Sequence, residues 1–219
     1  MSNTTLHYIY DPFCGWCFGA GPLLTEAREI EGLHVEPHSV GMLAGPRSKM
    51  MSPEWRDFVR PHEKRITAYS HVEFGAPYVN GTLEDPSVAL DSGVPTAAML
   101  AAEKLSGRGL EMLKRLQRAY YVEGLPISNR EVILSLADEL GYERQSFVKA
   151  FEDALHVTLE SHIEASNQLL SRLNARGFPA FALEIGGELE ALPVGRYFGR
   201  PEKFAADIRS KMATTQGEE

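Results

Sequence analysis

The sequence predicts an α/β fold whose core is interrupted by a large all-helical insertion. A strand, a helix and a second strand come first, over about residues 5–40. A long stretch with helical spacing follows, and strand character returns only near residue 178 as a hairpin before a final helix. This order assigns residues 1–43 and 176–213 to the core, 44–175 to the helical insertion and 214–219 to a disordered tail.

The N-terminal unit is expected to be a β-α-β crossover. Bulky side chains on both faces of residues 5–10 predict a buried strand. Apolar residues then take helical spacing from about 14 to 31. Pro22 lies inside that helix and removes a backbone hydrogen bond, so we expect a kink there. Gly32 ends the helix, and a second strand through about Val40 completes a parallel pair.

The insertion is expected to be helical throughout except for one extended loop. The predicted helices cover 53–71, 95–105, 108–123, 128–141 and 143–175, and the Gly-, Pro- and Asp-rich loop covers 75–93. Pro95 suits a first helical position, and Ser128 to Glu131 form a capping-box pattern. Beyond the insertion, an alternating segment that starts at Phe178 meets a Gly-Gly turn and runs back as a hairpin.

One face of the last insertion helix carries a His among acidic residues at four-residue spacing, a pattern that raises the question of a metal. The residues are Glu152, His156, Glu160 and Glu164. We interpret them as a solvated helix face, because no second helix supplies a matching Glu-x-x-His pattern. We therefore expect no bound metal.

Composition narrows the classes of partner. The 219 residues carry a formal net charge of −8 and no basic stripe, so nucleic acid and anionic membrane surfaces are poor partners. The N-terminus has no signal-peptide pattern, and no 18-residue apolar span occurs, so we expect a cytoplasmic protein. In that reducing compartment a disulfide is transient and catalytic rather than structural.

The chemistry centres on Cys14 and Cys17, the only cysteines in the chain, which lie two residues apart at the predicted strand-to-helix junction. Unpaired N–H groups at the start of the helix favour a thiolate at Cys14. Cys17 lies one turn further on, where it can close a disulfide and resolve a mixed one. A structural zinc site needs four ligands, and no second Cys pair exists. The pattern therefore indicates dithiol–disulfide exchange.

Gly15 and Trp16, between the two cysteines, are assigned as substrate-facing positions. For Trp16 two interpretations remain open: it tunes access to Cys14, or it simply covers the sulfurs.

The whole arrangement resembles the DsbA-like branch of the thioredoxin superfamily, and within it the soluble predicted protein-disulfide isomerases. The segments that carry the resemblance are Tyr10 to Cys17, Pro22 and Gly177 to Phe181. The resemblance implies a thioredoxin-like fold with a helical insertion, and a cis-proline facing the disulfide. We assign that proline to Pro179 rather than Pro95, because a strand and not a helix follows it. The resemblance also implies that Phe178 and Pro179 bind substrate, Phe178 by pairing its backbone with it.

One position departs from the family pattern. Relatives carry a buried carboxylate about six residues before the first cysteine, and this chain has Tyr8 there. Asp11 lies closer in sequence, but we expect a turn or helix-cap role for it.

The main hypothesis is a cytoplasmic thiol–disulfide oxidoreductase or protein-disulfide isomerase with Cys14 as nucleophile and Cys17 as resolving thiol. Its substrates would be protein or small-molecule disulfides and thiols. It needs no cofactor beyond the redox-active disulfide, with glutathione as a candidate co-substrate. One alternative is a glutathione-dependent transferase or isomerase resembling the kappa-class and chromene-carboxylate enzymes. Another is a redox-switched adaptor. The oligomeric state is left open.

Overall fold

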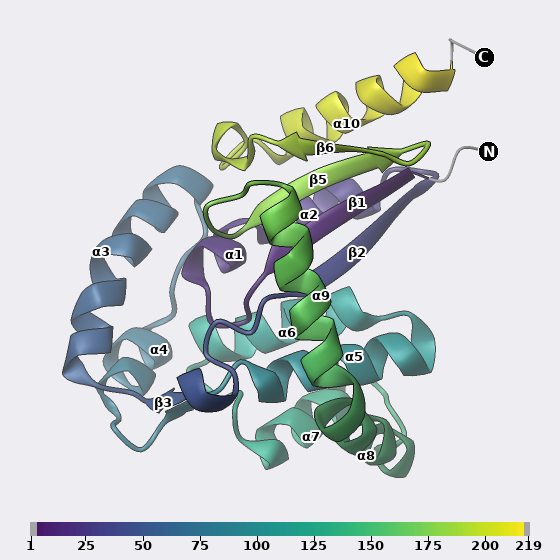
Figure 1. The fold of residues 1–219 in the computed structure, drawn as a ribbon. Coiled ribbons are helices and arrows are strands. Elements are labelled where there is room, and N and C mark those ends of the chain that lie inside the picture. The colour runs from purple at the N-terminus through teal and green to yellow at the C-terminus, as the bar shows by residue number, and fades with distance from the viewer. Residues whose placement is uncertain (1–3, 217–219) are drawn as a thin grey trace.

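A four-stranded mixed sheet forms the centre of the molecule (Figure 1). The structure is a computed structural model that describes residues 4–216. The strands are β1 (Thr4–Tyr10), β2 (Leu33–Ser39), β5 (Ala180–Ile185) and β6 (Glu188–Leu192), in the order β2-β1-β5-β6. β1 runs parallel to β2 and antiparallel to β5, which turns back into β6. The predicted β-α-β unit and C-terminal hairpin are therefore confirmed.

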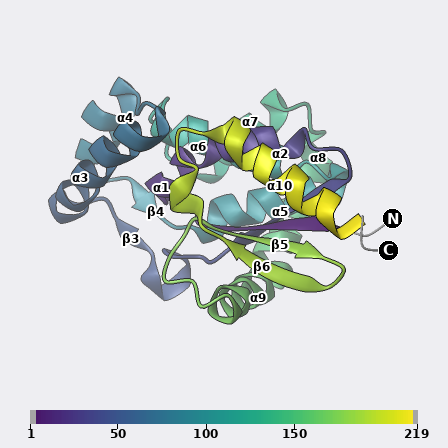
Figure 2. The same ribbon diagram turned by 90° about the horizontal axis from the view of Figure 1, so that it is seen from above.

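Helices cover both faces of this sheet. α2 (Gly21–Arg28) and α10 (Pro201–Gln216) pack together on one face, and α9 (Leu159–Arg172) crosses the other (Figure 2). Alternation along β1 explains the two layers, because successive side chains point to opposite faces. Leu6, Tyr8 and Tyr10 join the core under α2 and α10.

The predicted kink at Pro22 is a complete break. The chain forms a short α1 (Gly15–Gly19) and then α2, separated at Ala20. Pro22 thus occupies the first turn of α2, where its missing N–H would have no partner in the helix anyway.

The insertion consists mainly of helices, of which the first two lie on the side of α1 and the others beyond β2 (Figure 1). They are α3 (Pro53–Ser70), α4 (Ala76–Asn80), α5 (Gly93–Ser106), α6 (Gly109–Tyr121), α7 (Arg130–Glu139) and α8 (Arg144–Asp153). The predicted loop at 75–93 contains α4 and β4 (Ala89–Leu90), and β4 pairs with β3 (Lys49–Met50). Met99 of α5 and Leu113 of α6 join the core of the main sheet. The division into two domains at residues 44 and 175 stays a prediction.

The end of the insertion differs from the expected single helix. A π-helical segment, Ala154–Thr158, separates α8 from α9, and α9 leaves the helical layer to pack on β2. At the C-terminus, α10 extends to Gln216, where we expected a disordered tail from residue 214. The remaining tail residues, 217–219, lie outside the described residues. Within the described residues, no helix is long and apolar enough to cross a membrane.

Candidate active site

A tight turn between β1 and α1 positions Cys14. The carboxylate of Asp11 accepts a hydrogen bond from the Phe13 N–H at 2.9 Å, and the Asp11 carbonyl accepts one from the Cys14 N–H at 3.1 Å. Cys14 is the N-cap of α1, and its sulfur accepts a hydrogen bond from the Cys17 N–H at 3.2 Å. The structure therefore places both cysteines where the sequence predicts them, on the first turn of a helix.

The two sulfurs have unequal access to solvent. Cys14 is 8% exposed and lines a cavity of about 190 Å³, whereas Cys17 is fully buried behind it. Burial is the main cause that raises the pKa of Cys17 well above its ordinary value. The hydrogen bond and charge of Cys14 act in the same direction. A substrate in the cavity thus meets Cys14 first, while Cys17 is held as a thiol.

The loop before β5 faces the nucleophile. The Phe178–Pro179 peptide bond is cis, which confirms the choice of Pro179 over Pro95. The Phe178 carbonyl accepts a hydrogen bond from the Cys14 thiol at 3.7 Å, and Phe178 lines the same cavity. Gly15 and Trp16 also line it, whereas Pro179, the fourth residue predicted to bind substrate, does not. Their roles in substrate binding remain a prediction.

Trp16 forms part of the cavity wall. Its indole N–H donates to His62 Nδ1 at 3.4 Å, and its ring packs edge-on against Phe198 at 5.3 Å between centroids. Trp16 is thus held beside the cavity that leads to Cys14, and both interpretations of its role stay open.

The rest of the cavity wall is mainly apolar and aromatic, with His62 and Glu63 as its polar members, and sequence reasoning missed most of it. Most of it comes from α3 and from the helices next to it: Phe13, Met42, Trp55, Phe58, Val59, His62, Glu63, Ile66, Tyr78, Tyr120 and Tyr121. The spacing of Trp55, Phe58 and Val59 on α3 is typical of an ordinary core face. Only the fold shows that this face looks onto a dithiol.

Asp11 has the expected turn role and a second one. Its carboxylate is fully buried and also accepts bonds from the Met42 N–H at 2.6 Å and the Ser92 hydroxyl at 2.9 Å. Burial nevertheless raises its pKa to about 6. Its charge is among the causes that raise the pKa of Cys17. At the position of the family carboxylate, the Tyr8 hydroxyl donates to the Cys17 carbonyl at 3.2 Å.

The acidic helix face does not gather into a site. His156 lies 3.4 Å from Glu152, which also accepts from Arg130 at 3.0 Å, and all three side chains are substantially exposed. These contacts fit the solvated helix face that we expected.

Comparisons with known proteins agree with this geometry. The family described as DSBA-like thioredoxin domain matches residues 5–205. Among solved structures, the cytosolic disulfide reductase DsbM from Pseudomonas aeruginosa is 45% identical with a TM-score of 0.88, over 96% of this chain and 99% of that one. The same reductase with GSH is 44% identical with a TM-score of 0.88, over 95% and 99% of the two chains.

A more distant structure, a putative protein disulfide isomerase from Nitrosomonas europaea, has the same fold. It is 20% identical with a TM-score of 0.78, over 96% of this chain and 98% of that one. A comparison with curated proteins gives no match. The family match and the 45% identical reductase confirm the resemblance noted in the sequence: the chain belongs to the DSBA-like thioredoxin domain family and is a thiol–disulfide oxidoreductase.

Proposed function

We propose that this protein is a cytoplasmic disulfide reductase in which Cys14 attacks the substrate disulfide, Cys17 resolves the product and glutathione restores the dithiol. The observation that carries the proposal is the unequal access of the two sulfurs. The cavity reaches Cys14, and Cys17 is fully buried one helical turn behind it. An exchange enzyme needs this order, because the nucleophile must meet substrate before the resolving thiol does.

The catalytic cycle balances without a further cofactor. The Cys14 thiolate attacks one sulfur of a substrate disulfide, which forms a Cys14–substrate disulfide and releases the other half as a thiolate. Cys17 then loses its proton and attacks the Cys14 sulfur, which releases the second half and leaves a Cys14–Cys17 disulfide. Two glutathione molecules reduce that bond in turn and leave as glutathione disulfide.

The raised pKa of Cys17 has a consequence for the middle of this cycle. A buried thiol attacks slowly until it loses its proton, since the thiolate is the nucleophile. Resolution of the mixed disulfide on Cys14 therefore waits for Cys17 to lose its proton.

Two features support glutathione and a cytoplasmic role. The cavity beside Cys14 has a volume of about 190 Å³, which suits a small thiol better than a folded protein. The 45% identical reductase is described as cytosolic, and its structure with GSH shows a related fold together with that thiol. An extended substrate segment would instead lie along the backbone of Phe178, at the rim of the cavity.

The test compares Cys17→Ser with the matched variant Cys14→Ser. Each reduced protein is mixed with glutathione disulfide, and its mass is followed with time. Cys17→Ser is expected to gain one stable glutathione, because Cys14 reacts and nothing resolves the adduct. Cys14→Ser is expected to gain none on the same timescale, because Cys17 is buried. The wild type should pass through the adduct to an internal disulfide.

Turnover separates this proposal from the alternative enzyme class. The assay follows reduction of a disulfide peptide by glutathione, with the glutathione disulfide reduced in a coupled reaction. Loss of turnover in both variants supports the dithiol cycle. Full turnover in Cys17→Ser would instead indicate a monothiol enzyme of the glutathione transferase or isomerase type. A glutathione adduct on Cys17 rather than Cys14 would reverse the assigned roles.

A further inference from the structure

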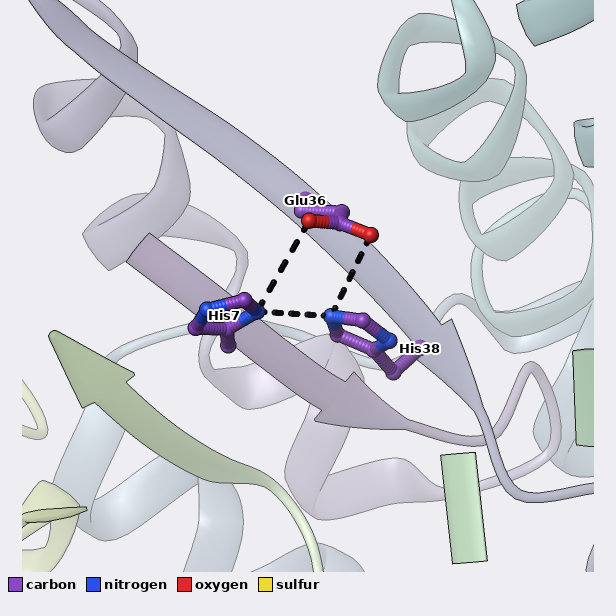
Figure 3. A group of neighbouring side chains, drawn as sticks. All are labelled: His7, Glu36 and His38. Carbon is purple, nitrogen blue, oxygen red and sulfur yellow. Dashed lines mark hydrogen bonds and ion pairs between the residues drawn. The ribbon is translucent and has the colours of Figure 1, made fainter. Parts of the chain in front are cut away.

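Two histidines and a glutamate converge on one point of the central sheet (Figure 3). His7 comes from β1, and Glu36 and His38 from alternate positions of β2. His7 Nδ1 lies 2.9 Å from His38 Nε2. The Glu36 carboxylate lies 3.8 Å from the first nitrogen and 3.9 Å from the second, too far for hydrogen bonds.

The cluster and the dithiol occupy opposite faces of the sheet. Side chains alternate along a strand, and the neighbours of His7, Leu6 and Tyr8, belong to the apolar core that contains both cysteines. His7 therefore points to the other face, which α9 covers. None of the chemistry proposed for Cys14 uses this cluster.

A second carboxylate fixes the ring of His7. Glu184 of β5 lies 3.1 Å from His7 Nε2, so the Nε2–H group donates a hydrogen bond to the carboxylate. The other ring nitrogen, Nδ1, then faces His38 and Glu36. A carboxylate that orients the outer nitrogen of a histidine in this way is typical of histidines that bind metals.

A third histidine, His162 of α9, faces the same region of the sheet. Its Nε2 accepts the Ser39 N–H at 3.1 Å, which leaves it outside the ligand triangle. Two carboxylates, Glu36 and Glu184, then supply charge to match a divalent cation.

The triangle has nearly the size that a metal needs. Ligand atoms held at about 2.0–2.1 Å on a tetrahedral zinc ion lie roughly 3.3 Å apart. The two ring nitrogens lie 2.9 Å apart, and one Glu36 oxygen lies 3.8 Å from His7 Nδ1 while the other lies 3.9 Å from His38 Nε2. One ligand atom from each residue lies within 4.8 Å of the other two, so side-chain shifts of roughly an ångström would bring the three atoms onto an ion. Glu36 is about half exposed and free to make that shift, and it leaves an open side for water as fourth ligand.

From this geometry we propose that His7, His38 and Glu36 bind a divalent transition-metal ion of the zinc class, with Glu184 orienting His7 from outside. Imidazole and carboxylate together favour zinc, copper or nickel over magnesium or calcium. The bound ion replaces the His7–His38 hydrogen bond, and the His38 proton moves to its other ring nitrogen. The ion ties β1 directly to β2. The proposal departs from our expectation of no metal, which was based on the acidic helix face alone.

Zinc titration of an untagged protein tests the site. Cys14 and Cys17 are both replaced by serine in this background, because free thiolates bind zinc themselves. Calorimetry should show one saturable equivalent in the micromolar range or tighter, and zinc should raise the melting temperature. Glu36→Gln and His38→Gln should each weaken binding at least tenfold. Glu184→Gln, which keeps the shape but not the charge, should weaken it by about 10–100-fold.

Controls make the outcome decisive. His156→Ala removes the exposed histidine of the acidic helix face and should leave zinc affinity unchanged. Glu36 lies at the rim, so Glu36→Gln is expected to fold, and circular dichroism checks this. In NMR spectra of the double-serine protein, the ring signals of His7 and His38 should shift when zinc is added. Binding only at millimolar zinc, or tight binding that survives both Glu36→Gln and His38→Gln, would overturn the proposal.

Discussion

Replacing Asp11 with asparagine separates two opposing effects on one buried carboxylate. Burial disfavours its charge, while bonds from Phe13, Met42 and Ser92 favour it. The rise in its pKa from 3.8 to about 6 means that burial is the stronger effect. At 1.36 kcal/mol per pKa unit, the charged form costs the folded state about 3 kcal/mol.

The sign of the pH dependence follows from that rise. Because the folded pKa lies above the unfolded one, protonation favours the folded state. The stabilisation is fully present below about pH 3.8 and is lost as the pH rises through about 6. Between pH 4 and 7 the wild type should lose about 2 kcal/mol from this group, a loss that Asp11→Asn cannot show.

The assay is urea unfolding of both reduced proteins at half-unit steps from pH 4 to 7.5, followed by circular dichroism. The difference between their free energies of unfolding removes the titration of all other groups. Its constant part reports the hydrogen bonds that asparagine disturbs, and its pH-dependent part reports the carboxylate. Ser92→Ala, which removes one donor, should move the midpoint of the wild-type dependence upward. A flat difference, or one in which the wild type gains stability above pH 4, would refute the reasoning.

Three further outcomes are expected. Burial lowers the pKa of His162 to about 4, so the folded protein should lose up to about 3 kcal/mol of unfolding free energy as the pH falls from 6.5 to 4. Urea unfolding of His162→Gln should show a smaller loss over the same pH range. Phe181 is buried and stacks on Tyr8 at 4.9 Å, so Phe181→Ala should cost about 3–5 kcal/mol of unfolding free energy. Phe58 lies on the cavity wall and is 58% exposed. Phe58→Ala should therefore change the free energy of unfolding by less than about 0.5 kcal/mol. Steady-state kinetics should show a higher KM for glutathione in this variant.

Local patterns in the sequence predict much of the fold, because the burial of a strand or helix face and the capping of a helix depend on residues close together in the chain. Bulk on both faces of β1 and the alternation of the hairpin are visible within a few residues. The capping box predicted to start at Ser128 is wrong by one residue, because the side chain of Asn129 caps α7. The break at Ala20 was not visible, since a proline at position 22 fits both a kinked helix and the start of a new one. The two-residue strand β4 and the short α4 were missed because such elements depend on distant partners and carry little periodicity of their own.

In the candidate site, too, the residues that are close in sequence were predictable and those brought together by the fold were not. Cys14 and Cys17 are adjacent in sequence, and their spacing alone predicts their chemistry. Trp55 and Phe58 reach the cavity only because α3 folds back over α1, a long-range event without a local signal. His7 and His38 are 31 residues apart and meet through strand pairing. The one local hint was the alternation of Glu36 with His38, which places both on one face of a strand.

The measurement that tests the account most directly is the redox equilibrium of Cys14 and Cys17 in graded glutathione buffers. Trp16, beside the cavity, supplies a fluorescence signal, and mass spectrometry confirms each state. The account expects a reversible two-electron transition between about −120 and −270 mV, the range of known exchange catalysts. A pair that never forms a disulfide, or forms one that glutathione cannot reduce, would contradict it.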